Sequence, residues 1–323
     1  MSHDGIHRMG QGAGGPDRPD RPSMAVVGCG GAGCNTLARA SERGWTLGRH
    51  VAVNTDAQHL LSTRAHRKIL IGRQTTGGRG TNMDITLGEM ACHEDRDQLH
   101  GVLAEIDIVI ILAGLGGGTG SGVAPVMAKI ARERGSLAIS LSTLPFSVEG
   151  STRRDNAMVS KANLAQHADL SMVVPNDTML ESGSNLSLLD AFAMADDSLL
   201  EPVRLLRRLL TREDMPWVRT ALNGAGAAHL GRGESDRRRG YAKALDGALA
   251  SIFPPVDPNE CSRALVMFHA GSDEPDDRTL LEMVRSLHLS MDPGARTLWG
   301  VHRDDLGEDR LRVVVMLATK PKR

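Results

Sequence analysis

Aromatic residues, paired cysteines and long apolar runs are scarce or missing in this sequence. Aromatic residues make up 2% of its 323 positions, so the core must be built from Leu, Val, Ile, Ala and Met. The four cysteines form no Cys-x-x-Cys pair and follow no signal peptide, which indicates reduced thiols and a cytoplasmic location. No apolar run approaches the roughly 18 to 20 residues that cross a bilayer.

Excess charge and metal-binding patterns are missing as well. The formal net charge of -1 gives no reason to expect nucleic acid or an anionic membrane as a partner. The basic run Arg237, Arg238 and Arg239 has no interleaved aromatic residues, which favours a solvated helix face over a nucleic-acid patch. The twelve histidines include no His-Glu-x-x-His motif, so zinc catalysis has no support and we predict no protein-bound metal.

The order of polar, apolar and Gly-rich segments predicts two folded domains. Residues 1–23 carry almost nothing apolar, and we predict a disordered arm. Residues 24–196 alternate short apolar strands with helical segments, which predicts an α/β domain with a doubly wound parallel sheet. Residues 197–218 predict a long amphipathic central helix that ends in a polar loop, and residues 219–323 predict a smaller α+β domain. The expected strands include 68–71, 107–113, 137–142, 170–175, 264–270, 297–302 and 311–318, with helices near 240–252 and 277–288.

A first glycine motif lies between the first strand and the first helix. Gly28, Gly30 and Gly33 satisfy the pattern Gly-x-Gly-x-x-Gly, and Asp56 follows at the end of the next strand. Positions without a Cβ allow a tight turn and close approach to phosphates, whose charge is favoured at a helix N-terminus. Taken alone, the motif fits a nicotinamide or flavin enzyme, a tight structural turn, or another nucleotide site.

A second glycine run, at 114–122, points more firmly to phosphate. It reads GLGGGTGSG and lies between an apolar strand and a helix that we expect to begin near Ala124. So many glycines cost roughly 0.5 to 1 kcal/mol each in backbone entropy, and a flexible linker would not sit between a buried strand and a helix. Successive backbone amides there can form an anion-binding nest, with Thr119 and Ser121 as hydroxyl donors. No G-x-x-x-x-G-K-[ST] motif occurs, so this is not a Walker-type site.

Six ordered phrases give the sequence a family resemblance. The phrases VVGCGGAGCN, VAVNTDA, AGLGGGTGSGVAP, PFSVEGSTRR, VPND and LLDAFAMADD resemble successive nucleotide-site loops of FtsZ, the prokaryotic relative of tubulin. The phrases ALVMFHAGSD and LRVVVMLAT resemble its C-terminal domain, so the similarity spans roughly residues 24–319. This resemblance implies the tubulin/FtsZ fold, a GTP or GDP ligand accompanied by Mg2+, and head-to-tail assembly.

The resemblance also implies roles for individual residues. Phe192 matches the aromatic residue beside guanine, and Asp197, preceded by Asp196, matches the carboxylate that pairs with the guanine N1 and N2 donors. Adenine lacks those donors, so a carboxylate there selects guanine. Glu149 and Arg153 match the acid and base on the ribose and phosphate side. The remaining expected nucleotide-binding residues are Gly31, Ala32, Gly33, Cys34, Asn35, Gly117, Gly118, Thr119, Gly120 and Asn176, where Ala32 and Cys34 replace the glycines usual in the family.

Two departures from the family bear on hydrolysis. In FtsZ, a loop of pattern N-x-D-x-x-D completes the active site of the neighbouring subunit. Here Asp214 matches the first acid and Glu213 is a further candidate, whereas Arg212 replaces the asparagine and Trp217 the second acid. Loss of one general base costs about 10² to 10⁴ in rate, so we expect slow or absent turnover. The loop at 76–82, which resembles the family's loop beside the terminal phosphate, is about two residues shorter and contains Arg79, either a phosphate ligand or a solvated side chain.

Three functions remain open at this point. The first is an FtsZ-like GTPase that hydrolyses GTP between filament subunits. The second is a hydrolysis-deficient GTP- or GDP-binding regulator that co-assembles with a hydrolysing FtsZ-like filament. The third is a nicotinamide-dependent oxidoreductase, which leaves the run at 114–122 unexplained. Because the chain ends directly after its last expected strand, we expect no direct membrane anchor.

Overall fold

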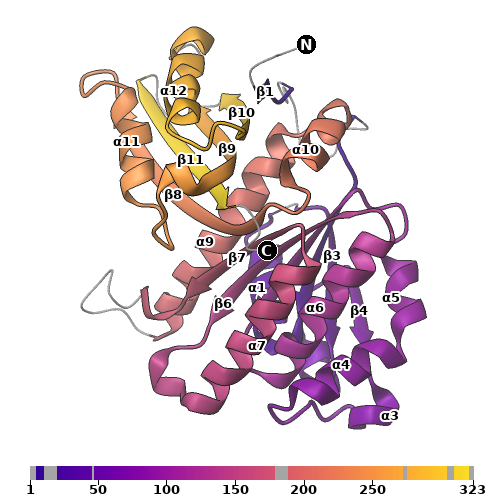
Figure 1. The fold of residues 1–323 in the computed structure, drawn as a ribbon. Helices are drawn as coiled ribbons and strands as arrows, with labels where there is room; N and C mark the ends of the chain where they lie inside the picture. Colours follow the sequence, from indigo (N-terminus) through magenta and orange to yellow (C-terminus); the bar gives the residue numbers. More distant parts are fainter. Residues whose placement is uncertain are drawn as a thin grey trace. The chain divides into compact units, whose positions relative to one another are not determined.

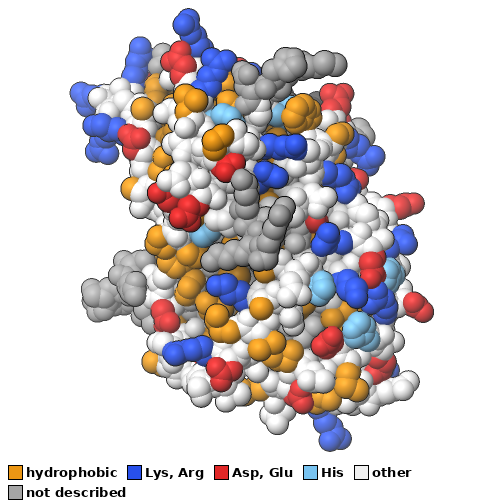
Figure 2. Space-filling model, in the orientation of Figure 1, with side chains coloured by type: hydrophobic (Ala, Val, Ile, Leu, Met, Phe, Trp, Pro, Cys, Tyr) orange, Lys and Arg blue, Asp and Glu red, His pale blue; other side chains and the backbone are white. Residues whose placement is uncertain are grey.

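The computed structural model describes residues 5–10, 20–45, 47–178, 188–271, 275–303 and 309–319. The chain divides into two compact units (Figure 1). One consists of Pro22–Arg204, and the other combines Met1–Arg21 with Leu205–Arg323. On the face drawn in Figure 2, basic and acidic side chains are interspersed, in line with the small net charge.

The unit Pro22–Arg204 is built on six parallel strands in the order β7-β6-β5-β2-β3-β4. Their buried residues on both faces explain the near-continuous apolar runs of the sequence. β2 pairs with β3 on one side and with β5 on the other, so the strand order reverses between β2 and β5. In open α/β sheets, ligands bind outside the carboxyl ends of the strands at such a switch point. The strands are β2 (Met24–Cys29), β3 (Arg49–Asn54), β4 (Arg67–Leu70), β5 (Ile108–Gly114), β6 (Leu137–Leu144) and β7 (Leu170–Pro175).

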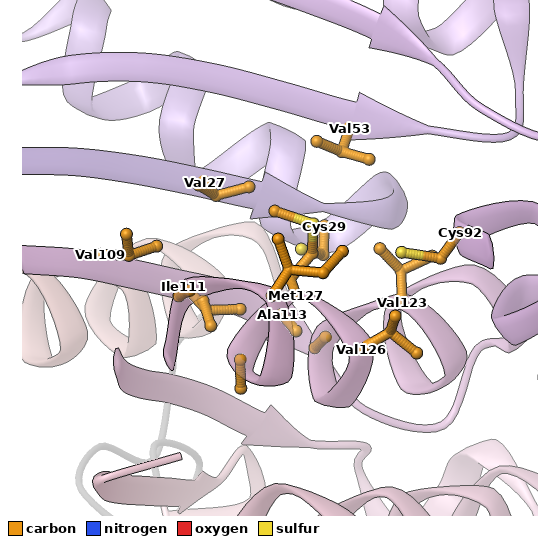
Figure 3. Close-up of a cluster of buried hydrophobic side chains, with 14 of the residues drawn as sticks. Val27, Cys29, Val53, Cys92, Val109, Ile111, Ala113, Val123, Val126 and Met127 are labelled. Carbon is orange, nitrogen blue, oxygen red and sulfur yellow. The ribbon is translucent and has the colours of Figure 1, made fainter. Parts of the chain in front are cut away.

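Helices cover this sheet and complete its core. Val27 and Cys29 of β2 and Ile111 of β5 belong to the same buried cluster as Val123 and Met127 of α6 (Figure 3). Alternate residues of the strands therefore pack against the helices, as period-two patterning requires. The helices of this unit are α1 (Gly30–Glu42), α2 (Ala57–Ser62), α3 (Arg73–Thr76), α4 (Ile85–Glu94), α5 (Arg96–Val102), α6 (Gly118–Glu133) and α7 (Ser151–His167), and α9 (Leu188–Leu209) begins in this unit and ends in the other.

The other unit contains a mixed sheet with the order β1-β10-β9-β11-β8. β1, β10 and β9 run parallel, and β11 runs antiparallel to β9 and β8. Phe268 and Trp299 meet edge to face in its core, with ring centroids 6.2 Å apart. The elements are β1 (Ile6–Arg8), β8 (Gly226–Asp236), β9 (Cys261–Ala270), β10 (Arg296–Arg303), β11 (Arg310–Thr319), α10 (Met215–Leu222), α11 (Ala242–Ala250) and α12 (Asp277–Leu289).

The arm predicted to be disordered over residues 1–23 contains ordered segments. Ile6–Arg8 form β1 on the edge of β10, Met9 is buried, and the buried Arg21 donates hydrogen bonds to the carbonyls of Arg207 and Leu210. The prediction was wrong for these segments because backbone pairing to an open sheet edge needs few apolar side chains. Residues 1–4 and 11–19 lie outside the described residues.

Three further elements differ from the expected boundaries. The predicted polar loop at 211–217 contains a 3-10 turn, η2 (Arg212–Asp214), followed directly by α10. The helix expected from about Ala124 begins at Gly118, and the central helix begins at Leu188 rather than at residue 197. The division into domains at 196/197 and 218/219 stays our proposal. No helix of the described residues is both long and apolar enough to cross a membrane.

Candidate nucleotide-binding site

A pocket of about 660 Å³ lies at the carboxyl ends of the parallel strands in the unit Pro22–Arg204. Its walls come from the segments that follow five of these strands, so it lies where the strand order predicts a ligand. Its volume is within the usual range of about 300 to 1,000 Å³ for ligand sites. The residues that line it include Gly31, Ala32 and Asn35 after β2, Asp56 and His59 after β3, Gly117–Gly120 after β5, Pro145 after β6 and Asn176 after β7.

Two helices begin at this pocket without side-chain caps. The N-cap positions of α1 and α6 are Cys29 and Gly117, and neither side chain accepts a hydrogen bond from its helix. The first turn of each helix also lacks acidic residues. The first N–H groups of a helix have no partner within the helix and carry partial positive charge. This arrangement favours an anion such as phosphate.

The glycines around these helix starts serve two different purposes. A Cβ on Gly118 would lie 2.3 Å from the Thr81 hydroxyl oxygen, and one on Gly120 would lie 2.6 Å from the Gly114 carbonyl oxygen, so both permit close packing of backbone segments. A Cβ on Gly117 would meet nothing within 4 Å, and one on Gly31 only the His59 ring at 3.8 Å. Since Gly31 and Gly117 line the pocket, their missing side chains leave space for a ligand.

The two hydroxyl residues of the second glycine run have different environments. Thr119 lines the pocket, and its hydroxyl lies 2.7 Å from that of Thr55 and 3.3 Å from that of Thr81. Ser121 is fully buried and accepts a hydrogen bond from the Gly116 N–H at 2.8 Å. Thr119 therefore remains a candidate phosphate donor, whereas Ser121 holds the loop in shape.

The pocket wall also offers an aromatic ring and a carboxylate. Phe192 meets Phe146 edge to face at 5.3 Å. Asp196 is buried, accepts a hydrogen bond from the Thr36 hydroxyl, and forms an ion pair with Arg39. Burial raises the pKa of the Asp196 carboxyl, and the Thr36 hydroxyl and the Arg39 guanidinium oppose that shift. Sequence reasoning missed Arg39, although it follows Asn35 by one helical turn on α1.

Three of the residues expected to bind the nucleotide are absent from the described pocket lining. Asp197 forms an ion pair with Arg43, and it is absent from the described pocket lining, whereas its neighbour Asp196 belongs to it. Cys34 is buried with its thiol 3.4 Å from the Gly28 carbonyl oxygen, and burial raises the pKa of this thiol to about 12. Gly33 packs against the carbonyl of Leu112. Cys34 and Gly33 thus pack against the backbone of β2 and β5 beneath the first glycine motif and do not line the pocket.

The expected ribose and phosphate residues lie together on one wall. Glu149 and Arg153 are 3.5 Å apart, and Glu149 also accepts a hydrogen bond from the Phe146 N–H at 2.7 Å. Asn176 is buried, and its Oδ1 atom has no hydrogen-bond partner among the described residues. A buried unsatisfied acceptor is costly, so its position on the pocket wall fits a ligand donor such as a hydroxyl.

The two candidate catalytic acids belong to the other unit. Asp214 is buried and accepts hydrogen bonds from the Gly10 N–H, from the N–H and hydroxyl of Thr211, and from the His7 ring. Glu213 is exposed. Trp217 is 38% exposed and stacks on His7, with ring centroids 4.7 Å apart. The described residues contain no group of three or more His, Cys, Asp or Glu residues arranged to hold a metal ion.

Comparison with known proteins identifies the family of this chain. Residues 23–184 match the model of the tubulin/FtsZ family GTPase domain. The chain belongs to this family. It is 39% identical over 297 residues to cell division protein FtsZ 1 of Pyrococcus furiosus. The aligned region covers 90% of this chain and 79% of that protein. The first glycine motif therefore belongs to a GTPase domain and not to a nicotinamide enzyme.

Solved structures of the family confirm the predicted fold class. An FtsZ dimer from M. jannaschii superposes with a TM-score of 0.83 at 36% identity and covers 92% of this chain and 88% of its own. A GTPγS-bound protofilament of CetZ2 from Haloferax volcanii gives a TM-score of 0.76 at 26% identity. This match covers 93% of this chain and 94% of the CetZ2 chain. The parallel sheet, its helices and the tubulin/FtsZ fold are thus shared with these proteins.

Proposed function

We propose that this chain binds GTP and GDP in the pocket described above and assembles head to tail into filaments that serve cell division. In this proposal GTP is hydrolysed slowly, between adjacent subunits. One observation carries it: a single pocket joins two uncapped helix N-termini to the buried Asp196 carboxylate. The family's GTPase domain and the division proteins among its relatives support the same function.

Different residues of the pocket would bind the phosphates and the ribose. The N-termini of α1 and α6 bind the phosphates, with Gly31 and Gly117 leaving room for them. Magnesium accompanies the phosphates and takes most of its ligands from phosphate oxygens and water, as this ion usually does. Glu149, Arg153 and Asn176 lie beside the ribose.

The base would be selected by an aromatic ring and a carboxylate of the pocket wall. Phe192 packs beside the guanine ring. Asp196, and not Asp197, accepts hydrogen bonds from guanine N1 and N2, because only Asp196 is part of the described pocket lining. Adenine offers no N1 or N2 donor to the Asp196 carboxylate, which disfavours adenine nucleotides.

Slow hydrolysis follows from the state of the candidate acids. Asp214 already accepts hydrogen bonds from four donors of its own unit, so its oxygens are poor acceptors for a proton from an attacking water. Glu213 is the exposed carboxylate of this segment, and Trp217 occupies the position of the second family acid.

The dimer of FtsZ and the protofilament of CetZ2 support self-association for a family member.

The exposed Trp217 favours a second candidate function. A large aromatic side chain at a subunit contact adds affinity through buried area while contributing no general base. The chain would then be a hydrolysis-deficient subunit that binds GTP or GDP and regulates a hydrolysing FtsZ-like filament by co-assembly.

One experiment separates these functions. Turnover of GTP with Mg2+ is measured across a protein concentration series for the wild type and Trp217→Asp, beside binding of GTP and GDP by titration calorimetry. Turnover that rises more than linearly with wild-type concentration supports the assembling GTPase. Binding without turnover, with turnover gained in Trp217→Asp, supports the regulator. Absence of binding to either nucleotide overturns both.

A further inference from the structure

A basic side chain that the family pattern does not include lines the pocket at its phosphate end. Arg79 lies in the loop between α3 and α4, and the segment from Arg79 to Met83 forms part of the pocket wall. The backbone of Arg79 pairs with that of Asp56 as an isolated β-bridge. The side chain of Arg79 is exposed at the pocket, so it is accessible to a ligand from solvent.

Hydrogen bonds fix this loop against the glycine run of α6. The Gly80 N–H donates to the Thr55 carbonyl at 3.1 Å, and the Thr81 hydroxyl lies 3.3 Å from that of Thr119. The amide of Asn156 on α7 donates to the Met83 carbonyl at 2.8 Å and to the Gly116 carbonyl at 3.2 Å. Asn156 thus ties the loop and the glycine run together, and Arg79 is placed beside the first turn of α6.

The loop is held in an unfavourable backbone conformation. Asn82 and Met83 have φ angles of 46° and 68°, in the left-handed region that residues with side chains seldom adopt. Such residues persist where the surrounding contacts over-determine them, and they cluster at ligand-binding sites. Here the Asn156 clamp and the Asp84 N–H, which donates to the Thr81 carbonyl at 2.9 Å, supply those contacts.

Arg79 differs in its ion pairing from Arg39 and Arg153, which also line the pocket. Arg39 pairs with Asp196, the proposed partner of the base, and Arg153 pairs with Glu149. Among the described residues, Arg79 has no carboxylate within ion-pair distance. An unpaired guanidinium on a loop that contacts the N-terminus of α6 strengthens the positive potential there, and its planar fork suits a phosphate group.

We infer that Arg79 binds the terminal phosphate of GTP and thereby makes the pocket prefer the triphosphate to the diphosphate. This inference rests on the proposed guanine-nucleotide site. The helix N-termini bind the phosphates that GTP and GDP share, and the Arg79 loop meets the first turn of α6, where the Thr81 hydroxyl lies 3.3 Å from that of Thr119. The guanidinium donates N–H bonds to oxygens that GDP lacks, so its contribution is confined to the triphosphate.

The test compares Arg79→Ala and Arg79→Lys with a matched control, Arg73→Ala. Arg73 is an exposed arginine of α3, close in sequence and absent from the described pocket lining. Dissociation constants for GDP and for a non-hydrolysable GTP analogue with Mg2+ are measured by calorimetry, at low and high salt. Thermal unfolding verifies that each variant is folded.

We expect Arg79→Ala to weaken binding of the GTP analogue by about tenfold to a hundredfold, with GDP binding changed less than twofold. Arg79→Lys should give an intermediate loss, because an ammonium keeps the charge without the fork. Arg73→Ala should leave both constants unchanged. An unaltered ratio of the two constants in Arg79→Ala overturns the inference alone. Failure of the wild type to bind either nucleotide overturns the proposed function and the inference with it.

Discussion

The carboxylate of Asp214 accepts a hydrogen bond from the backbone N–H of Gly10, 204 positions earlier in the chain, with the nitrogen 3.1 Å from each carboxylate oxygen. The same carboxylate caps η2 through the N–H and hydroxyl of Thr211. The His7 ring, on the strand that precedes Gly10, lies 3.3 Å from it. The residue that matches a family catalytic acid therefore anchors the N-terminal segment to its own unit.

Replacement of Asp214 should lower the stability of this unit. Asp214→Asn removes the charge and one acceptor oxygen, and it leaves buried N–H donors without a full partner. We expect a loss of about 1 to 3 kcal/mol in the free energy of unfolding. Urea unfolding followed by circular dichroism measures it. Glu213→Gln, which alters an exposed carboxylate next to it, is the control and should change stability by less than about 0.5 kcal/mol. Equal stability of the two variants would contradict the anchoring role.

Substitution of Gly117 should weaken nucleotide binding without destabilising the fold. Gly117 has φ −81° and ψ 162°, which alanine adopts readily, and a Cβ there would meet no protein atom within 4 Å. Gly117→Ala should therefore unfold at the same temperature as the wild type. The added methyl group would fill the space beside the first N–H groups of α6, so we expect GDP and GTP affinities to fall by about tenfold or more.

The control for this variant is Gly101→Ala. Gly101 lies on α5, has open space around its missing Cβ, and is absent from the described pocket lining. It should leave nucleotide affinity unchanged and raise stability slightly, because alanine loses less backbone entropy than glycine on folding. Wild-type affinity in Gly117→Ala would mean that the phosphates lie elsewhere.

The adjacent acids Asp196 and Asp197 provide a matched pair for base selection. Asp196 is buried in the pocket with Thr36 and Arg39, whereas Asp197 pairs with Arg43. Asp196→Ala should reduce the preference for GTP over ATP by about tenfold to a hundredfold, since the guanine N1 and N2 donors lose their acceptor. Asp197→Ala should preserve that preference. Competition between labelled GTP and unlabelled ATP measures both variants, and the reverse result would return the role to Asp197.

Prediction from sequence succeeded where local patterns carry the information. The apolar runs of β5 and β6 and the glycine run before α6 specify buried parallel strands and a loop at their ends, and the structure places them as expected. β8 was missed because Gly226–Asp236 has Gly, His, Arg and Glu in place of an apolar alternation, and its pairing with β11 stabilises it instead. The orientation of Asp196 toward Arg39 depends on how α9 and α1 pack, which neither local segment encodes.

Buried His50 should make the unit Pro22–Arg204 less stable in mild acid. His50 is 3% exposed, and burial, reinforced by the neighbouring His66 ring, lowers its pKa from 6.5 to about 4. Its Nδ1 atom bonds the Ser41 hydroxyl at 2.8 Å, and its Nε2 atom is buried without a partner among the described residues. The unfolded chain therefore binds a proton near pH 6.5 that the folded chain binds only near pH 4.

This difference sets the direction of the pH effect. The stabilising contribution of neutral His50 is fully present above pH 6.5 and is lost as the pH falls toward 4. Between pH 7 and pH 4.5 we expect a loss of at most about 2 to 3 kcal/mol from this residue. Urea unfolding of the wild type and His50→Gln at both pH values measures it. The variant cannot titrate at this position, so its stability should fall less between the two pH values. Parallel losses in the two proteins would place the acid sensitivity in other groups.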